Sequence, residues 1–198
     1  MPPDEALERL KAGNRRFIER TRDPERSLWR PGLAQGQRPI AVVFSCSDSR
    51  SPAELVFDQG LGDLFMIRIA GNIVAPSGIG SVEYAVTRLG VRLVVVMGHT
   101  HCGAVQATLD TFGKLGPQEA EHIKSITGRI GPHIAELVEL DLPPEEKMLR
   151  AVRANVLASL DQLRHGSALL EQLDRSGRVD FKSCVLNLEN GEVEWLSA

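Results

Sequence analysis

The chain has 198 residues and a net charge of −3, with 42% hydrophobic and 25% charged residues, values that fit one globular domain. Charges of both signs are mixed along it, which excludes the basic surface of a nucleic-acid-binding protein. No apolar run approaches the roughly 20 residues of a membrane span, and the N-terminus lacks the basic and apolar regions of a signal peptide. We therefore expect a cytoplasmic protein without membrane contact.

The first segment of the chain predicts a helix. Pro3 followed by Asp4 and Glu5 is typical of a helix start, because carboxylates favour the positive end of the helix dipole. The apolar stripe that follows is thin. We therefore expect this helix to pack on another element and not to form a core of its own. The segment 22–37, rich in proline, glycine and charge, is typical of a connector.

From residue 39 onward, apolar runs alternate with helical patterns. Continuous runs of β-branched and other apolar residues are typical of strands buried on both faces, and they lie at 40–44, 64–69 and 93–97. Helical patterns lie between and after them, at 51–57, 80–89 and 144–163. Near the C-terminus, the runs 181–188 and 193–196 flank Asn190-Gly191, a strong hairpin turn signal.

The alternation of strand and helix implies right-handed crossover connections. The sequence therefore predicts an α/β fold with a mainly parallel β-sheet flanked by helices, an N-terminal helical arm and a C-terminal hairpin. We expect a single domain over 1–198, with the arm and connector at 1–36 and the α/β core at 37–198.

Two clusters of chemically active residues follow predicted strands, at 45–50 and 98–103. Ligands bind outside the carboxyl ends of the strands in parallel sheets, so Cys46, His99 and Cys102 can meet there. Two thiolates and an imidazole suit Zn²⁺, and three protein ligands leave the fourth tetrahedral position free.

Alternatives to this metal site stay open from spacing alone. His101 is an alternative to His99 as the ligand. Side chains two residues apart on a short turn point away from each other, so only one of the two histidines can share a metal ion with Cys102. Cysteines at strand ends also occur as buried packing residues, which is our expectation for Cys184. Three cysteines form a small, odd set that argues against a disulfide framework and for a reducing compartment.

A carboxylate and a guanidinium stand two residues apart, at Asp48 and Arg50. An arginine next to an aspartate holds it ionised and orients it through a bidentate pair. Beside an open zinc position, Asp48 can accept a hydrogen bond from zinc-bound hydroxide or occupy the fourth zinc position itself. The alternative is a plain structural ion pair.

Taken together, these motifs resemble the β-class carbonic anhydrases. The segments that carry the resemblance keep the order and spacing of the family between Gln37 and about Val105. They are Cys46-Ser47-Asp48-Ser49-Arg50, Gly62-Asp63-Leu64-Phe65, Ala70-Gly71-Asn72, Ser81-Val82-Glu83-Tyr84-Ala85-Val86 and Gly98-His99-Thr100-His101-Cys102-Gly103. Beyond this stretch the likeness depends mainly on Asn155-Val156.

The resemblance implies one Zn²⁺ per chain, held by Cys46, His99 and Cys102, which decides the choice between the two histidines. Asp48 and Arg50 match the catalytic dyad of the family. In some members this aspartate coordinates zinc in a closed state and is drawn away by the arginine in the open state, so Asp48 is also a candidate metal ligand.

The resemblance also implies a substrate pocket. Gln37 matches a glutamine that helps to bind substrate, Phe65 and Tyr84 match aromatic positions lining the pocket, and Gly103 offers a backbone N–H near the zinc. The family builds its site at a dimer interface, so Gln37, Phe65 and Tyr84 are expected to reach the partner's zinc. A homodimer or a dimer of dimers follows, with the N-terminal helix lying on the other subunit.

The implied activity is the reversible hydration of carbon dioxide to bicarbonate and a proton, by attack of zinc-bound hydroxide. The enzyme class would be a zinc lyase, carbonate dehydratase. One alternative is a hydrolase of carbonyl sulfide or carbon disulfide on the same zinc site. A less favoured alternative is a non-catalytic zinc-binding protein.

One departure from the family pattern concerns a second, non-catalytic bicarbonate pocket that some members build from a tryptophan, an arginine and a tyrosine. The matching positions here hold Val43, Arg68 and Leu186. Two of the three side chains are lost, so the sequence predicts that this inhibitory pocket is missing.

Overall fold

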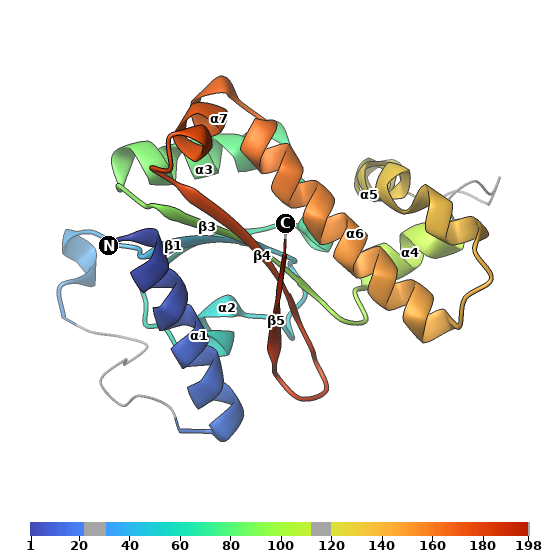
Figure 1. The fold of residues 1–198 in the computed structure, drawn as a ribbon, viewed down its shortest axis with the longest axis horizontal. Helices are drawn as coiled ribbons and strands as arrows, with labels where there is room; N and C mark the ends of the chain where they lie inside the picture. The colour runs from blue at the N-terminus through green and yellow to red at the C-terminus, as the bar shows by residue number, and fades with distance from the viewer. Residues whose placement is uncertain (22–30, 112–119, 198) are drawn as a thin grey trace.

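The fold is built on a five-stranded sheet with the strand order β2-β1-β3-β4-β5. Figure 1 shows this sheet with helices on both sides, in a computed structural model that describes residues 1–21, 31–111 and 120–197. The strands are β1 (Ala41–Ser45), β2 (Leu64–Arg68), β3 (Leu93–His99), β4 (Asp180–Leu186) and β5 (Val193–Leu196). Neighbouring strands are parallel except for the antiparallel pair of β4 and β5. The predicted α/β fold with a C-terminal hairpin is therefore confirmed.

The described part of the chain forms seven α-helices and two short 3₁₀ turns. The helices are α1 (Pro3–Glu19), α2 (Ala53–Val56), α3 (Pro76–Arg88), α4 (Gly103–Thr111), α5 (Glu121–Glu139), α6 (Pro144–His165) and α7 (Ala168–Arg175). The 3₁₀ turns are η1 (Leu33–Gln35) and η2 (Ala70–Asn72). Within the described ranges, no helix has both the length and the apolar character that crossing a bilayer requires.

Helix α5 is not predicted by the sequence pattern, because Gly128, Gly131 and Pro132 interrupt its helical spacing. A proline inside a helix removes a backbone hydrogen bond and costs about 3 kcal/mol. Ile130 and Ile134 on the same helix are fully buried, and α5 packs against α4 and α6. Tertiary packing therefore decides the conformation of this segment.

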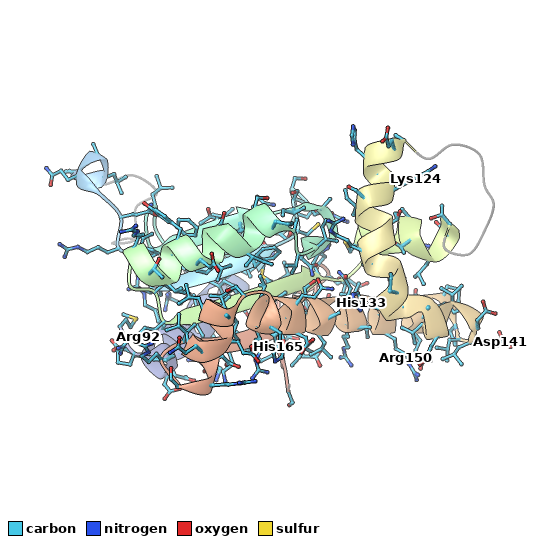
Figure 2. All side chains as sticks on the ribbon, turned by 90° about the horizontal axis from the view of Figure 1, so that it is seen from above. Arg92, Lys124, His133, Asp141, Arg150 and His165 are labelled. Carbon is cyan, nitrogen blue, oxygen red and sulfur yellow. The ribbon has the colours of Figure 1, made fainter. Side chains whose placement is uncertain are left out.

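Successive residues of the inner strands point to opposite faces of the sheet, and both faces are buried. On one face, Phe44 of β1 lies in a core formed with α3, α5, α6 and α7. On the other face, Val43 lies in a core formed with α1 and α2. Figure 2 shows the helices of the first face from above, with exposed side chains such as Lys124 and Arg150 pointing to solvent.

The strand order brings the two predicted motifs to one edge of the sheet. β1 and β3 are hydrogen-bonded neighbours, with Ser45 opposite Met97, and adjacent strands lie about 4.8 Å apart. Cys46 follows Ser45 directly, and His99 is the last residue of β3. Their side chains therefore meet at the carboxyl edge, where α/β sheets form ligand sites.

The N-terminal helix packs with one face on its own chain, and the expectation that it also lies on another subunit stays a prediction. Leu10 is fully buried in the core against the sheet. The side-chain amide of Asn14 donates to the carbonyls of Val56 (3.2 Å) and Gly191 (2.9 Å) and accepts from the backbone N–H of Val193 (3.0 Å). These hydrogen bonds, one buried and two partly buried, attach α1 to its own chain in a way that its thin apolar stripe did not predict.

We expect Gly13→Ala to destabilise the fold, because a Cβ at residue 13 would collide with the carbonyl of Phe57. Overpacking of this kind lowers the free energy of unfolding by about 1–3 kcal/mol. Gly128→Ala is the matched control, since nothing lies within 4 Å of a Cβ there and alanine stabilises a helix by about 0.5–1 kcal/mol over glycine. Urea unfolding measures both. A Gly13→Ala protein as stable as the wild type would show that α1 does not dock on Phe57.

Candidate metal centre

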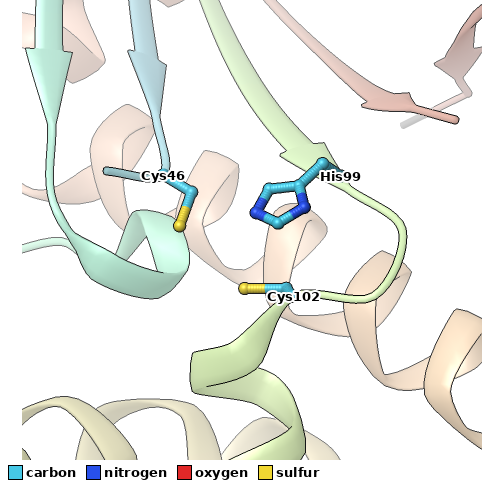
Figure 3. A group of neighbouring side chains, drawn as sticks. All are labelled: Cys46, His99 and Cys102. Carbon is cyan, nitrogen blue, oxygen red and sulfur yellow. The ribbon is translucent and has the colours of Figure 1, made fainter. Parts of the chain in front are cut away.

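Three side chains converge at the carboxyl edge of the sheet, those of Cys46, His99 and Cys102 (Figure 3). One ligand atom from each lies within 4.8 Å of the others, and all three residues are buried. Cys46 follows β1, His99 ends β3, and Cys102 immediately precedes α4. The two strand ends and the turn between β3 and α4 therefore position the whole group.

The imidazole of His99 is oriented by its own turn. Its Nδ1 atom lies 2.9 Å from the carbonyl of Thr100, and because a carbonyl can only accept, Nδ1 carries the proton. The lone pair is then on Nε2, which is buried and has no hydrogen-bond partner among the described residues. A buried nitrogen with a free lone pair is what a metal ligand requires.

The two thiols of the group interact with each other. A shared hydrogen bond holds the pKa of Cys46 well below its ordinary value, and the same bond together with burial raises the pKa of Cys102. The backbone N–H of Gly71 also donates to Sγ of Cys46, at 3.2 Å. One sulfur is therefore prepared to be a thiolate, and a cation is needed to displace the proton of the other.

The residues present thus fit a zinc ion. Two sulfurs and one imidazole nitrogen are the donor set that Zn²⁺ prefers, and the unpartnered Nε2 atom of His99 is turned toward the sulfurs (Figure 3). A Cys₂His set also leaves one tetrahedral position for water or substrate.

Asp48 and Arg50 form a bidentate pair beside this group. Arg50 donates from Nε to Oδ1 of Asp48 at 3.0 Å and from Nη2 to Oδ2 at 2.8 Å. This guanidinium holds the pKa of Asp48 far below its usual range. Oδ2 of Asp48 lies 3.8 Å from Nε2 of His99, so the carboxylate faces the proposed ligands while it is bound to the arginine.

The second histidine of the motif is turned away from the group. His101 has a left-handed backbone, with a φ of +55°, and its carbonyl accepts a hydrogen bond from Arg50 at 3.2 Å. Its exposed imidazole lies 3.8 Å from a carboxylate oxygen of Glu189. The residue therefore contributes its backbone to the dyad, while His99 supplies the imidazole.

Arg68, at the end of β2, holds the loop that carries Cys46 and Asp48. Its guanidinium donates to the carbonyl of Cys46 at 3.1 Å and to the carbonyl of Asp48 at 2.6 Å. The sequence pattern gives no signal for this contact, which depends on the register that sets Arg68 opposite Ser45. That the second bicarbonate pocket is missing stays a prediction.

The four residues expected to bind substrate do not all lie at the candidate metal centre. Gly103 begins α4 directly after Cys102 and so lies at the metal centre. Gln37 is exposed in the segment before β1, at the opposite end of that strand. Phe65 and Tyr84 lie with ring centroids 6.1 Å apart, and Tyr84 is half exposed. Within one chain, Gln37 is therefore not brought to the three ligand residues.

The third cysteine, Cys184, is sealed inside the sheet. It is fully buried in the core beneath α1 and α2 and stands opposite Trp195 in the β4–β5 pair. Burial alone raises the pKa of its thiol, which keeps it protonated and unreactive. Its position agrees with the packing role expected from the sequence.

Comparison with known proteins identifies one family. The family model for carbonic anhydrase matches residues 41–193. Carbonic anhydrase 2 of Mycobacterium tuberculosis is 46% identical over 134 residues, which are 67% of this chain and 64% of that protein. The carbonic anhydrase of Pseudomonas aeruginosa is 36% identical over 195 residues, covering 91% of this chain and 84% of that protein. The match thus spans just under two thirds of the M. tuberculosis protein.

Solved structures give the same result. A β-carbonic anhydrase of Sordaria macrospora, one of two described as tetrameric, matches with a TM-score of 0.73 and 25% identity over 85% of each chain. The β-carbonic anhydrase CafA of Aspergillus fumigatus matches with a TM-score of 0.72 and 28% identity, covering 98% of this chain and 90% of that one.

We expect Cys46→Ala and Cys102→Ala to reduce bound zinc from about one ion per chain to nearly none, because each removes one of three ligands. Cys184→Ala is the matched control, since this thiol is buried in the sheet core and should leave the metal content unchanged. Elemental analysis after gel filtration in a weak chelator measures the stoichiometry. Full zinc content in Cys46→Ala would contradict this ligand set.

Proposed function

This chain belongs to the family of β-class carbonic anhydrases, and on that premise we propose that it catalyses the reversible hydration of carbon dioxide to bicarbonate and a proton, with one zinc ion per chain. The observation that carries the proposal is the convergence of Cys46, His99 and Cys102 beside the Asp48–Arg50 pair. A purely structural zinc site would not need an ionised carboxylate next to its ligands.

Cys46, His99 and Cys102 would hold the metal, and Zn²⁺ bound there would act as a Lewis acid that allows a water molecule to lose a proton near neutral pH. The chain supplies the rest of the environment. Burial of the three ligand residues excludes bulk water from their side of the site, and the N–H of Gly103 is available at the start of α4.

Asp48 would orient the attacking water by accepting a hydrogen bond from it. Arg50 keeps this carboxylate ionised and fixes its direction through two side-chain hydrogen bonds. Because both oxygens of Asp48 are bound to Arg50, we assign Asp48 to the dyad and not to the fourth metal position. This arrangement corresponds to the open state that some family members adopt.

The substrate pocket would be completed by a second copy of the chain. Gln37 and Tyr84 are exposed, and Gln37 lies at the opposite end of β1 from Cys46, so it is available to a partner's centre. We therefore propose a homodimer or a dimer of dimers in which Gln37, Phe65 and Tyr84 reach the partner's zinc. The need to keep Cys46 reduced as a metal ligand fits a cytoplasmic location.

We expect Asp48→Asn to lower the rate of carbon dioxide hydration by roughly 10²- to 10⁴-fold, because a neutral amide is a weaker hydrogen-bond acceptor than a carboxylate and offers Arg50 only one acceptor oxygen. Arg50→Gln should lower it in the same direction, and zinc content should stay at the wild-type value in both. Stopped-flow hydration between about pH 6.5 and about pH 9 measures the rates.

The same assay separates the alternatives. Sulfide release from carbonyl sulfide with little hydration of carbon dioxide would identify the hydrolase instead. A zinc-loaded wild type as inactive as Asp48→Asn throughout the pH range would contradict catalysis altogether.

The shared site gives a second test, in which Gln37→Ala and Asp48→Asn chains are mixed after each is shown to be nearly inactive. In a mixed dimer one site carries both defects and the other carries neither. Random exchange should therefore restore roughly a quarter of the wild-type activity. Activity that stays at the mean of the two separate variants would show that Gln37 serves its own chain's site.

A further inference from the structure

The sulfur of Cys46 receives a backbone hydrogen bond from a segment far along the chain. The N–H of Gly71, in η2, donates to Sγ of Cys46 at 3.2 Å, and both residues are buried. A donor at this distance withdraws charge from a thiolate, and hydrogen bonds to ligand sulfur tune metal centres. The orientation of one peptide N–H therefore bears on how strongly this sulfur donates to a metal.

The turn that presents this N–H does not have a conformation that the chain adopts by itself. Gly71 and Asn72 are consecutive left-handed residues, with φ values of +65° and +44°. A non-glycine residue in this region costs about 1–2 kcal/mol, and such conformations persist only where the surroundings hold them. A Cβ at Gly71 would also press on Ile130 and Ala104. Something outside η2 must therefore hold it.

Helix α6 supplies that support through two buried side chains one turn apart. Asn155 donates from Nδ2 to the carbonyl of Gly71 at 2.8 Å, and Ser159 donates from Oγ to the carbonyl of Asn72 at 2.9 Å. Asn72 returns a hydrogen bond from Nδ2 to Oγ of Ser159 at 3.3 Å. Asn155, Ser159 and Asn72 are each only 2% exposed, so water does not compete for these bonds.

The same helix is fixed against the strand that carries His99. Val156, the neighbour of Asn155, packs where a side chain at Gly98 would otherwise stand, since a Cβ at Gly98 would collide with it. This packing fixes the position of α6 relative to β3. The hydrogen bond of Asn155 then fixes η2 relative to α6.

We propose that Asn155 is a positioning residue of the metal centre: by holding the carbonyl of Gly71, it keeps the N–H of Gly71 on the sulfur of Cys46 and so sets the electron donation of that ligand. This inference rests on the proposed zinc site and activity. It assigns a function to a residue that touches neither a metal ligand nor the dyad.

The test compares Asn155→Leu with wild type in two measurements that do not depend on turnover. Zinc affinity, from competition with a chromophoric chelator, should fall roughly 10- to 100-fold, as is usual when support around a ligand is lost. In protein loaded with Co²⁺, the thiolate-to-cobalt charge-transfer band should move to longer wavelength, because a sulfur without its hydrogen bond holds its electrons less tightly.

Two further variants separate positioning from folding. Asn14→Leu makes the same substitution at another buried asparagine, which binds backbone groups on the opposite face of the sheet. It should lower the unfolding temperature while leaving the zinc affinity and the cobalt band unchanged. Ser159→Ala removes only a hydroxyl and should shift both readouts in the direction of Asn155→Leu by a smaller amount, even if Asn155→Leu fails to fold.

The outcomes are distinct. Wild-type affinity and an unshifted band in folded Asn155→Leu, or in Ser159→Ala if Asn155→Leu does not fold, would overturn the inference and leave the proposed function standing. Equal changes in Asn14→Leu would overturn it as well, since the effect would then be one of general stability. A wild type that binds neither Zn²⁺ nor Co²⁺ would overturn the proposed function, and this inference with it.

Discussion

The candidate metal centre is built around two sulfurs and one imidazole nitrogen that are buried within 4.8 Å of one another. Such atoms lose their contacts with water, and buried polar groups without partners cost free energy. The Nε2 atom of His99 is one of these, because no described residue bonds to it. A soft divalent cation would satisfy all three atoms at once. Binding of such a cation would therefore offset part of the cost of burying these atoms.

Two layers of support keep these atoms together. The parallel pairing of β1 with β3 sets Cys46 and His99 at one edge, which fixes their backbone positions but not the direction of their side chains. The side-chain directions depend on two further contacts. Arg68 of β2 donates hydrogen bonds to the loop after β1, and α6 donates one to η2. The sheet determines where the ligands stand, and elements distant in sequence determine how they point.

The sequence could predict whatever depends on local order along the chain. Cys46 follows a recognisable strand and Asp48 is two residues from the arginine that binds it, so spacing was sufficient to place these two. The choice of His99 over His101 came from the family resemblance and not from spacing. Contacts across the fold were not predictable in this way. Asn155 bonds a carbonyl 84 positions away, and helix α5 forms despite an internal proline because its apolar residues are buried. The attachment of α1 to its own chain was not predictable either, because part of it depends on a polar residue, Asn14, which bonds to backbone groups far along the chain.

Asn14 also has a consequence for the order in which the chain folds. Its side chain bonds to Gly191 and Val193, which lie 177 and 179 positions later. Contacts between segments so far apart in the chain form slowly, and during synthesis β5 is made long after α1. Helix α1 therefore completes its docking only after β5 has been made, and until then the part of the sheet core that α1 covers is not fully buried.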